Sequence, residues 1–337
     1  MTTAARRQKI GVQSANLMRL RDCVSSVDAD IDLDAKWNVL DIDASVNRCT
    51  AAATEALKLD TPRLSLEQRI HLHQIFLSMR HAHEAVRELL RNEGKRALAV
   101  SVMPLVRAQV ETLYALCLII EQPSVLGDYM KDGWKKLFVR HIAMREECRS
   151  LPRVMEGLSK QLQWIDQMQV ASGVTNAERE TIEAEELGVA LPVGVSPTHI
   201  TPFPMPKKVI SKISDADRKR MLMLMRLYPE YSFLCGFVHF SPASVILASL
   251  LDPRQPFRAM FTSGQIEEMF QKEIAGPAVW FDVLSVVQCC SELLDIYPGD
   301  VELARCCADA WKPLSENTFI GRVIWKLRAR RLLGVIA

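Results

Sequence analysis

Three polar side chains form a stripe through the apolar segment YSFLCGFVHFSP, residues 231–242. Tyr231, Cys235 and His239 recur in it every four residues. On a helix this spacing places a phenol, a thiol and an imidazole on one face. An imidazole with a hydrogen-bonding partner is the usual group for proton transfer in general acid–base catalysis. In a core, the same imidazole needs a partner only to satisfy its nitrogen atoms. The stripe therefore predicts either a site or a polar contact within the core.

A charged pair interrupts a second apolar segment, residues 97–120. Arg107 and Glu111 are four residues apart, so they share one helix face. Charged groups in such surroundings are normally paired. If this face packs against the stripe, Glu111 would hydrogen-bond His239 and raise its proton affinity. We therefore predict a polar seam made of Arg107, Glu111, Tyr231 and His239, with a catalytic and a structural interpretation both open.

The histidines do not predict a metal site. Two ligands on one helix face need a spacing of three or four residues, whereas the pairs in HLH and HAH are two residues apart. The nine cysteines include no C-x-x-C, and no nucleotide-loop or metalloprotease motif occurs. We predict neither a metal nor a cofactor. The histidines concerned are His71, His73, His81 and His83.

Basic residues gather near the C-terminus, in GRVIWKLRARRLLG. Arg322, Lys326 and Arg330 recur every four residues, with Arg328 and Arg331 beside them. A basic helix face of this kind would bind a nucleic acid or an acidic partner. A terminal helix with a basic end also complements its own dipole, and this structural role is favoured because no series of aromatic residues is interleaved with the basic ones.

The motifs of the polar seam resemble a family of uncharacterised bacterial helical proteins that is grouped with HEPN-like domains. The likeness covers residues of two zones, about 80–140 and 225–250, and the family often has Ser where this chain has Cys235. It implies a helical fold that shares the four residues of the seam. HEPN ribonucleases have an Arg followed after four to six residues by His, and none of the seven histidines here fits that spacing. The motifs are Glu93-Gly94, Arg107-x-x-x-Glu111 and Tyr231-x-x-Leu234-Cys235-x-x-Val238-His239-x-Ser241.

The elements that must position these residues are all helical. Ser65 and Gly94 bound one predicted helix, Pro104 predicts a kink in the next, and Pro152 separates two more. Thr-Asn-Ala-Glu at 175–178 is a capping box. We predict an all-α, multi-helix bundle around a central apolar pair, 97–120 and 231–240. The other predicted helices span about 65–94, 124–150, 153–171, 214–240 with a break near Pro229, 263–275 and 277–297, with further ones starting at 175, 242 and 316.

The chain divides into an N-terminal helix and acidic irregular extension, 1–60, and a helical domain, 61–337. Five prolines between 189 and 208 predict an irregular loop inside that domain. The segment 28–43 is acidic and predicts a loop.

Composition gives no overall signal for a nucleic-acid or membrane partner, which would have to be bound by a local patch. Lys plus Arg total 42 and Asp plus Glu 40, so no overall field attracts nucleic acid or membrane. Residues 97–120 could span a bilayer by length, but charges in their middle cost about 2.5–3.5 kcal/mol each. We expect no membrane partner, a cytoplasmic location from the density of thiols, and an oligomer as one option.

Three functions fit these observations. The first is binding or metal-independent cleavage of RNA in a defence or toxin-type module. His239 would be its acid–base group, Glu111 would orient it, Arg107 would pair with phosphate, and Tyr231 would donate a positioning hydrogen bond. The second is a non-catalytic interaction or assembly protein with a structural seam. The third is a small-ligand pocket. A seam open to solvent favours a site, and a sealed one favours a structural role. The small-ligand pocket would use the same cleft and is distinguished by which ligand shifts the melting temperature.

Overall fold

A computed structural model describes residues 39–91, 100–214, 217–238, 242–252, 254 and 260–336. Within these ranges every regular element is helical, which confirms the predicted all-α class. The helices of the body are α2 (Val39–Ala56), α3 (Leu66–Arg91), α5 (Val102–Glu121), α9 (Pro206–Lys212), α10 (Arg218–Val238), α11 (Pro242–Leu251), α12 (Ser263–Phe270), α13 (Gly276–Glu292), α14 (Val301–Asn317), α15 (Phe319–Leu327) and α16 (Leu333–Ile336). A π-turn, Gln271–Ala275, joins α12 to α13, and 3-10 turns span Leu293–Asp295 and Ala329–Leu332.

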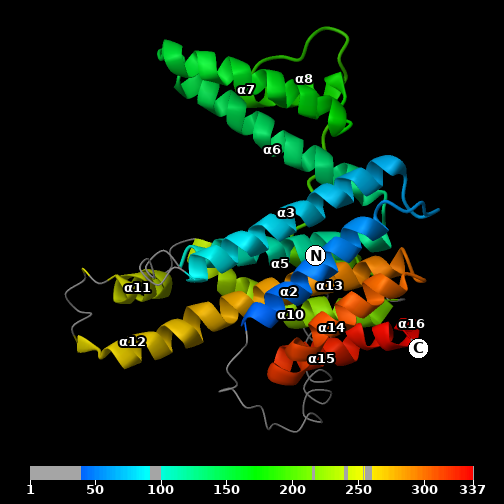
Figure 1. Ribbon diagram of the computed structural model, residues 1–337. Helices are drawn as coiled ribbons and strands as arrows, with labels where there is room; N and C mark the ends of the chain where they lie inside the picture. Colours follow the sequence, from blue (N-terminus) through cyan, green and yellow to red (C-terminus); the bar gives the residue numbers. More distant parts are fainter. Residues whose placement is uncertain are drawn as a thin grey trace, which may run out of the picture.

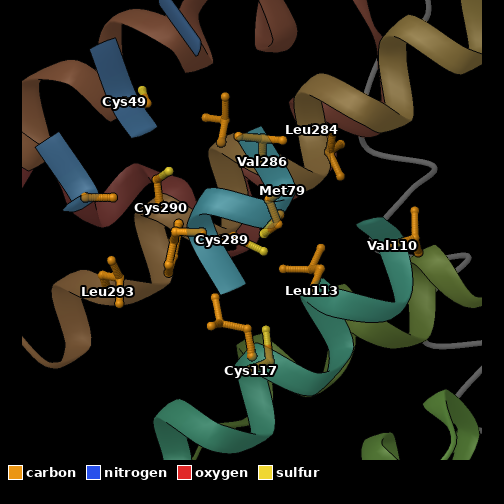
Figure 2. Packing of buried hydrophobic residues seen from close by; sticks show 14 of the residues in the cluster. Cys49, Met79, Val110, Leu113, Cys117, Leu284, Val286, Cys289, Cys290 and Leu293 are labelled. Carbon is orange, nitrogen blue, oxygen red and sulfur yellow. The ribbon is translucent and has the colours of Figure 1, made fainter. Parts of the chain in front are cut away.

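Two apolar helices, α5 and α13, form the centre of the body (Figure 1). Both are apolar on nearly every face, and such helices are stable only when surrounded by protein or lipid. Leu113 and Cys117 of α5 point toward Cys289 of α13 in Figure 2. The predicted pairing of α5 with the segment 231–240 is confirmed as far as residue 238, because α10 packs on α5. The predicted two-helix centre did not include α13, although a helix was predicted there; α13 is more deeply buried than α10.

By length and composition alone, two helical stretches could cross a membrane. They are Val102–Glu121 and Gly276–Asp295, with mean hydropathies of 1.4 and 1.3. Within the protein, 67% and 83% of these windows are buried. Core helices share this composition, so the finding is weak evidence on membranes. For Val102–Glu121 the burial agrees with the interpretation of 97–120 as a helix enclosed by protein.

Three helices form an arm that extends from the body (Figure 1). The three-helix arm consists of α6 (Val125–Glu147), α7 (Pro152–Ala171) and α8 (Asn176–Leu187). The predicted boundaries hold: Pro152 opens α7, and Thr175 with Glu178 forms the capping box of α8. The arm has a core of its own, made of Trp134, Phe138, Ile142, Ile165, Val174, Ile182 and Ile200.

The proline-rich segment is irregular from 189 to 205, as predicted, and its last three residues belong to α9. It is nevertheless packed. Ile200 is buried in the core of the arm, and the amide of Thr198 donates to the hydroxyl of Thr181 at 3.0 Å. The ring of Phe203 meets that of Tyr129 edge to face at 5.0 Å between centroids. The segment therefore follows the arm back to the body instead of forming a free excursion.

Several boundaries differ from the predictions. The predicted break near Pro229 is wrong: α10 runs through it, because packing of its buried residues outweighs the lost backbone hydrogen bond. Pro104 lies in the first turn of α5, where helices tolerate proline, so it does not mark an internal kink. The predictions also did not include α14. The loop predicted for 28–43 overlaps the first turn of α2, which begins at residue 39. Both helices gain their stability from packing on each other.

Buried thiols line the core. The eight cysteines in the described part of the chain are free, and both adjacent pairs, Cys289-Cys290 and Cys306-Cys307, are buried. Burial raises the pKa of Cys117 and of Cys289 well above the ordinary thiol value. These two side chains therefore stay protonated near neutral pH and act as small apolar groups.

Candidate functional site

Three of the four predicted seam residues meet where α10 crosses α5. Arg107 Nη2 donates to Glu111 Oε1 at 2.7 Å, and the hydroxyl of Tyr231 donates to the same oxygen at 2.8 Å. The guanidinium lies 5.7 Å from the centre of the Tyr231 ring and 3.4 Å from its hydroxyl oxygen. His239 lies outside the described residues, so its predicted contact with Glu111 stays a prediction.

The surroundings keep the Tyr231 phenol and the Arg107 guanidinium in one protonation state near neutral pH. Burial, together with the hydrogen bond to Glu111, raises the pKa of Tyr231, although Arg107 opposes the shift. Burial lowers the pKa of Arg107, but Tyr231 and Glu111 outweigh that effect and raise it overall. The phenol thus remains a donor and the guanidinium remains charged. Arg107 and Tyr231 hold the carboxylate of Glu111 in place, and neither exchanges a proton near pH 7.

Glu111 also borders a pocket between the body and the three-helix arm. The pocket has a volume of about 530 Å³. One wall is α5, another is the arm, and the end of the proline-rich segment with α9 closes a third. Four aromatic residues and three methionines contribute to the lining, which is more apolar than polar. The lining residues are Ala108, Glu111, Thr112, Tyr114, Ala115, Tyr129, Met130, Asp132, Gly133, Trp134, Lys136, Leu137, Met168, Ser172, Phe203, Pro204, Met205, Pro206 and Val209.

Two polar groups of this pocket have unused hydrogen-bonding capacity. Oε1 of Glu111 accepts from Arg107 and Tyr231, whereas Oε2 has no partner among the described residues. The hydroxyl of Tyr129 likewise makes no hydrogen bond within that part of the chain. Burial raises the pKa of Tyr129, with Lys136 opposing and Glu111 adding to the shift, so the phenol is protonated. An acceptor and a donor are therefore available to a ligand.

A buried ion network lies at the C-terminal end of α13. Its members are Arg220, Glu292, Asp295, Arg328 and Arg331. Glu292 is fully buried, accepts from Arg328 Nε and Nη2 at 2.7 Å, and accepts from Arg220 Nε at 2.9 Å. Arg220 and Arg328 also bond Asp295. Burial would raise the pKa of Glu292, but Arg328, Arg331 and Arg220 bring it far below the ordinary value of 4.5.

This network borders a second pocket of about 620 Å³. The guanidinium groups of Arg220 and Arg328 are already bonded to carboxylates on several sides, so they offer few donors to an incoming anion. The arrangement ties the C-terminal turn to the core, and we assign it a structural role.

The predicted basic face of the C-terminus does not form as one stripe. The helix α15 ends at Leu327, so the four-residue repeat of Arg322, Lys326 and Arg330 is interrupted. Arg328 is only 9% exposed and belongs to the buried ion network with Arg331. Arg322 donates to the carbonyl groups of residues 315 and 316. Only Lys326 and Arg330 are exposed, because the other side chains satisfy carboxylates and carbonyls of the same chain.

One histidine of the predicted helix 65–94 is buried beside a carboxylate. His83 is 2% exposed, and its Nδ1 lies 2.6 Å from Oδ2 of the fully buried Asp282. Asp43 approaches its other nitrogen at 3.8 Å and also pairs with Arg87 at 2.7 Å. The sequence feature that could have predicted this contact is Asp282, an acidic residue inside the apolar segment 276–292. The described residues contain no group of three His, Cys, Asp or Glu side chains that could hold a metal.

In comparisons with known proteins, no family model, no curated protein and no solved structure matches this chain.

Proposed function

We propose that this protein binds a small organic molecule in the pocket between α5 and the three-helix arm, with Glu111 as the polar anchor. The observation that carries the proposal is the pocket itself. Its volume of about 530 Å³ and its apolar, aromatic lining with a few polar groups are typical of ligand sites. It also lies between two structural units with separate cores, where such sites are common.

Filling the pocket from one wall tests this proposal. Gly133 lies in the wall, and a Cβ atom built there meets no heavy atom within 4 Å. We expect Gly133→Phe to project its ring into the pocket and to weaken binding of the neutral fluorescent probe N-phenyl-1-naphthylamine at least tenfold. The measurement is a fluorescence titration of the folded variants, with circular dichroism to confirm the helix content.

Gly127→Phe is the matched control, because Gly127 is on the same helix, equally free of neighbours within 4 Å, and outside the pocket. Its probe affinity should stay within twofold of the wild type. Equal affinities for wild type, Gly133→Phe and Gly127→Phe would exclude this pocket as the binding site.

A second candidate is metal-independent cleavage of RNA, supported by the contact of Arg107, Glu111 and Tyr231. Here Glu111 would orient His239, the acid–base group, while Arg107 would stabilise negative charge developing at phosphorus. Wild type should then cleave a mixed RNA pool without added metal, and His239→Ala and Glu111→Gln should abolish cleavage with little change in melting temperature. A wild type that cuts no RNA, with both variants melting several degrees lower, would instead assign the seam to the core of an interaction or assembly protein.

A further inference from the structure

We infer that the ligand of this pocket is an uncharged, planar nitrogen heterocycle with an N–H donor, such as a nucleobase or nucleoside without phosphate. The inference rests on the proposed function and adds the chemical class of the ligand. It follows from three features of the site: the aromatic side chains of the lining, a donor and an acceptor without partners among the described residues, and the balance of charge.

The walls favour a flat ring. Tyr129 lines the pocket from α6 and Phe203 lines it from the proline-rich segment, and both side chains are only half-buried. Aromatic rings bind other π systems by stacking or edge contacts, at about 1–3 kcal/mol for a base on an aromatic side chain. Methionine thioethers complete the surface and adapt to irregular shapes. They come from Met130, Met168 and Met205.

The polar groups of the lining favour a ring that both donates and accepts hydrogen bonds. Oε1 of Glu111 is held by Arg107 and Tyr231, which orients the carboxylate and leaves Oε2 as a charged acceptor. A ring N–H or an exocyclic amino group donating to Oε2 would form a charge-assisted bond. The hydroxyl of Tyr129, in the same lining, can donate to a ring nitrogen or carbonyl oxygen. Nucleobases present both groups along one edge.

The charges exclude a phosphate and disfavour a full cation. The charged side chains in the lining are Glu111, Asp132 and Lys136, and Lys136 already pairs with Asp132 at 2.7 Å. A phosphate would therefore meet no free cation in the lining and would lie beside the carboxylate of Glu111. A ligand ammonium at Glu111 would in turn compete with Arg107, which already neutralises that carboxylate. The remaining class is a neutral ring that offers an N–H group.

Isothermal titration calorimetry with the four common ribonucleosides and their 5′-monophosphates tests the inference. We expect at least one nucleoside to bind ten times tighter than its monophosphate. Glu111→Gln should weaken that binding about tenfold and Tyr129→Phe about fivefold, whereas Gly133→Phe should remove it and Gly127→Phe should leave it unchanged. Tyr228→Phe, a change to a ring outside the lining, should also leave it unchanged.

The naphthylamine probe separates failure of this inference from failure of the proposed function. If Gly133→Phe abolishes probe binding but no nucleoside binds or displaces the probe, the ligand class is wrong and the pocket remains a site. A monophosphate that binds as tightly as its nucleoside also overturns the ligand class. If the probe binds wild type and Gly133→Phe equally, the proposed function fails, and this inference fails with it.

Discussion

Replacing Glu292 with glutamine is expected to lower the free energy of unfolding by about 3–5 kcal/mol. The carboxylate is fully buried and accepts hydrogen bonds from Arg220 and Arg328, so its removal leaves guanidinium charges inside the protein with too little compensation. Removing one partner of a buried ion pair costs far more than the pair contributes as a whole. Urea denaturation at pH 7, followed by circular dichroism, gives the difference.

The same carboxylate predicts a pH dependence. The folded-state pKa of Glu292 is far below its ordinary value of 4.5, so the ionised form contributes stability at every pH above about 4.5. That contribution is lost as the pH falls below 4.5 toward the folded-state pKa. The stability difference between wild type and Glu292→Gln should therefore be constant near neutral pH and shrink in acid.

Glu156→Gln serves as the control, because the pair of Glu156 with Lys160 is 71% and 73% exposed. Exposed pairs contribute at most about 1 kcal/mol, so this variant should unfold close to the wild type. If Glu292→Gln were no less stable than Glu156→Gln, the buried ion network would not be what fastens the C-terminal turn to α13.

Trp134→Ala is expected to unfold the three-helix arm while the body stays folded. Trp134 is 2% exposed, stacks on Phe138 at 4.8 Å between ring centres, and donates its Nε1–H to the carbonyl of Ile165 at 2.9 Å. Truncating a buried tryptophan costs about 3–5 kcal/mol. The arm has a small core of its own, so this loss falls on the arm and not on the central helices.

Hydrogen exchange measured by mass spectrometry checks this expectation. Amides of α6, α7 and α8 should exchange faster in Trp134→Ala, while those of α5 and α13 keep their protection. Trp164→Ala is the control, since Trp164 is 47% exposed on α7. Equal loss of protection in the arm and in α13 would mean that arm and body unfold as one unit. The pocket should also lose its probe, because Trp134 and its helix form one wall.

Local rules located most of the helices. Pro152, the capping box at Thr175 and the proline at 242 each mark a helix start that the structure has within a residue or two. These signals work because they depend on backbone groups only a few residues away. The pairing of Arg107 with Glu111 was predictable for the same reason, since a spacing of four residues fixes their proximity on any helix.

Contacts between segments far apart in the sequence could not be predicted from such local signals. The amphipathic helix α14 packs on α2, and neither was recognised in full, because their stability comes from each other. The basic C-terminal residues form a regular repeat in sequence, yet Arg328 turns inward to a carboxylate 36 positions away. A repeat says which side chains share a face. It does not say whether that face meets solvent or a buried acid.

By itself, the sequence determined the all-α class, most helix starts, the irregular proline-rich segment and the pairing of Arg107 with Glu111. Only the tertiary structure decided that Tyr231 reaches Glu111, that Glu292 gathers three arginines, and that arm and body enclose a pocket. The physical reason is the distance along the sequence over which each kind of interaction acts. Helix propensity, capping and i,i+4 pairing act within one or two turns, whereas pockets and buried charge clusters depend on which helices pack together, and that is set by the sum of burial over the whole chain.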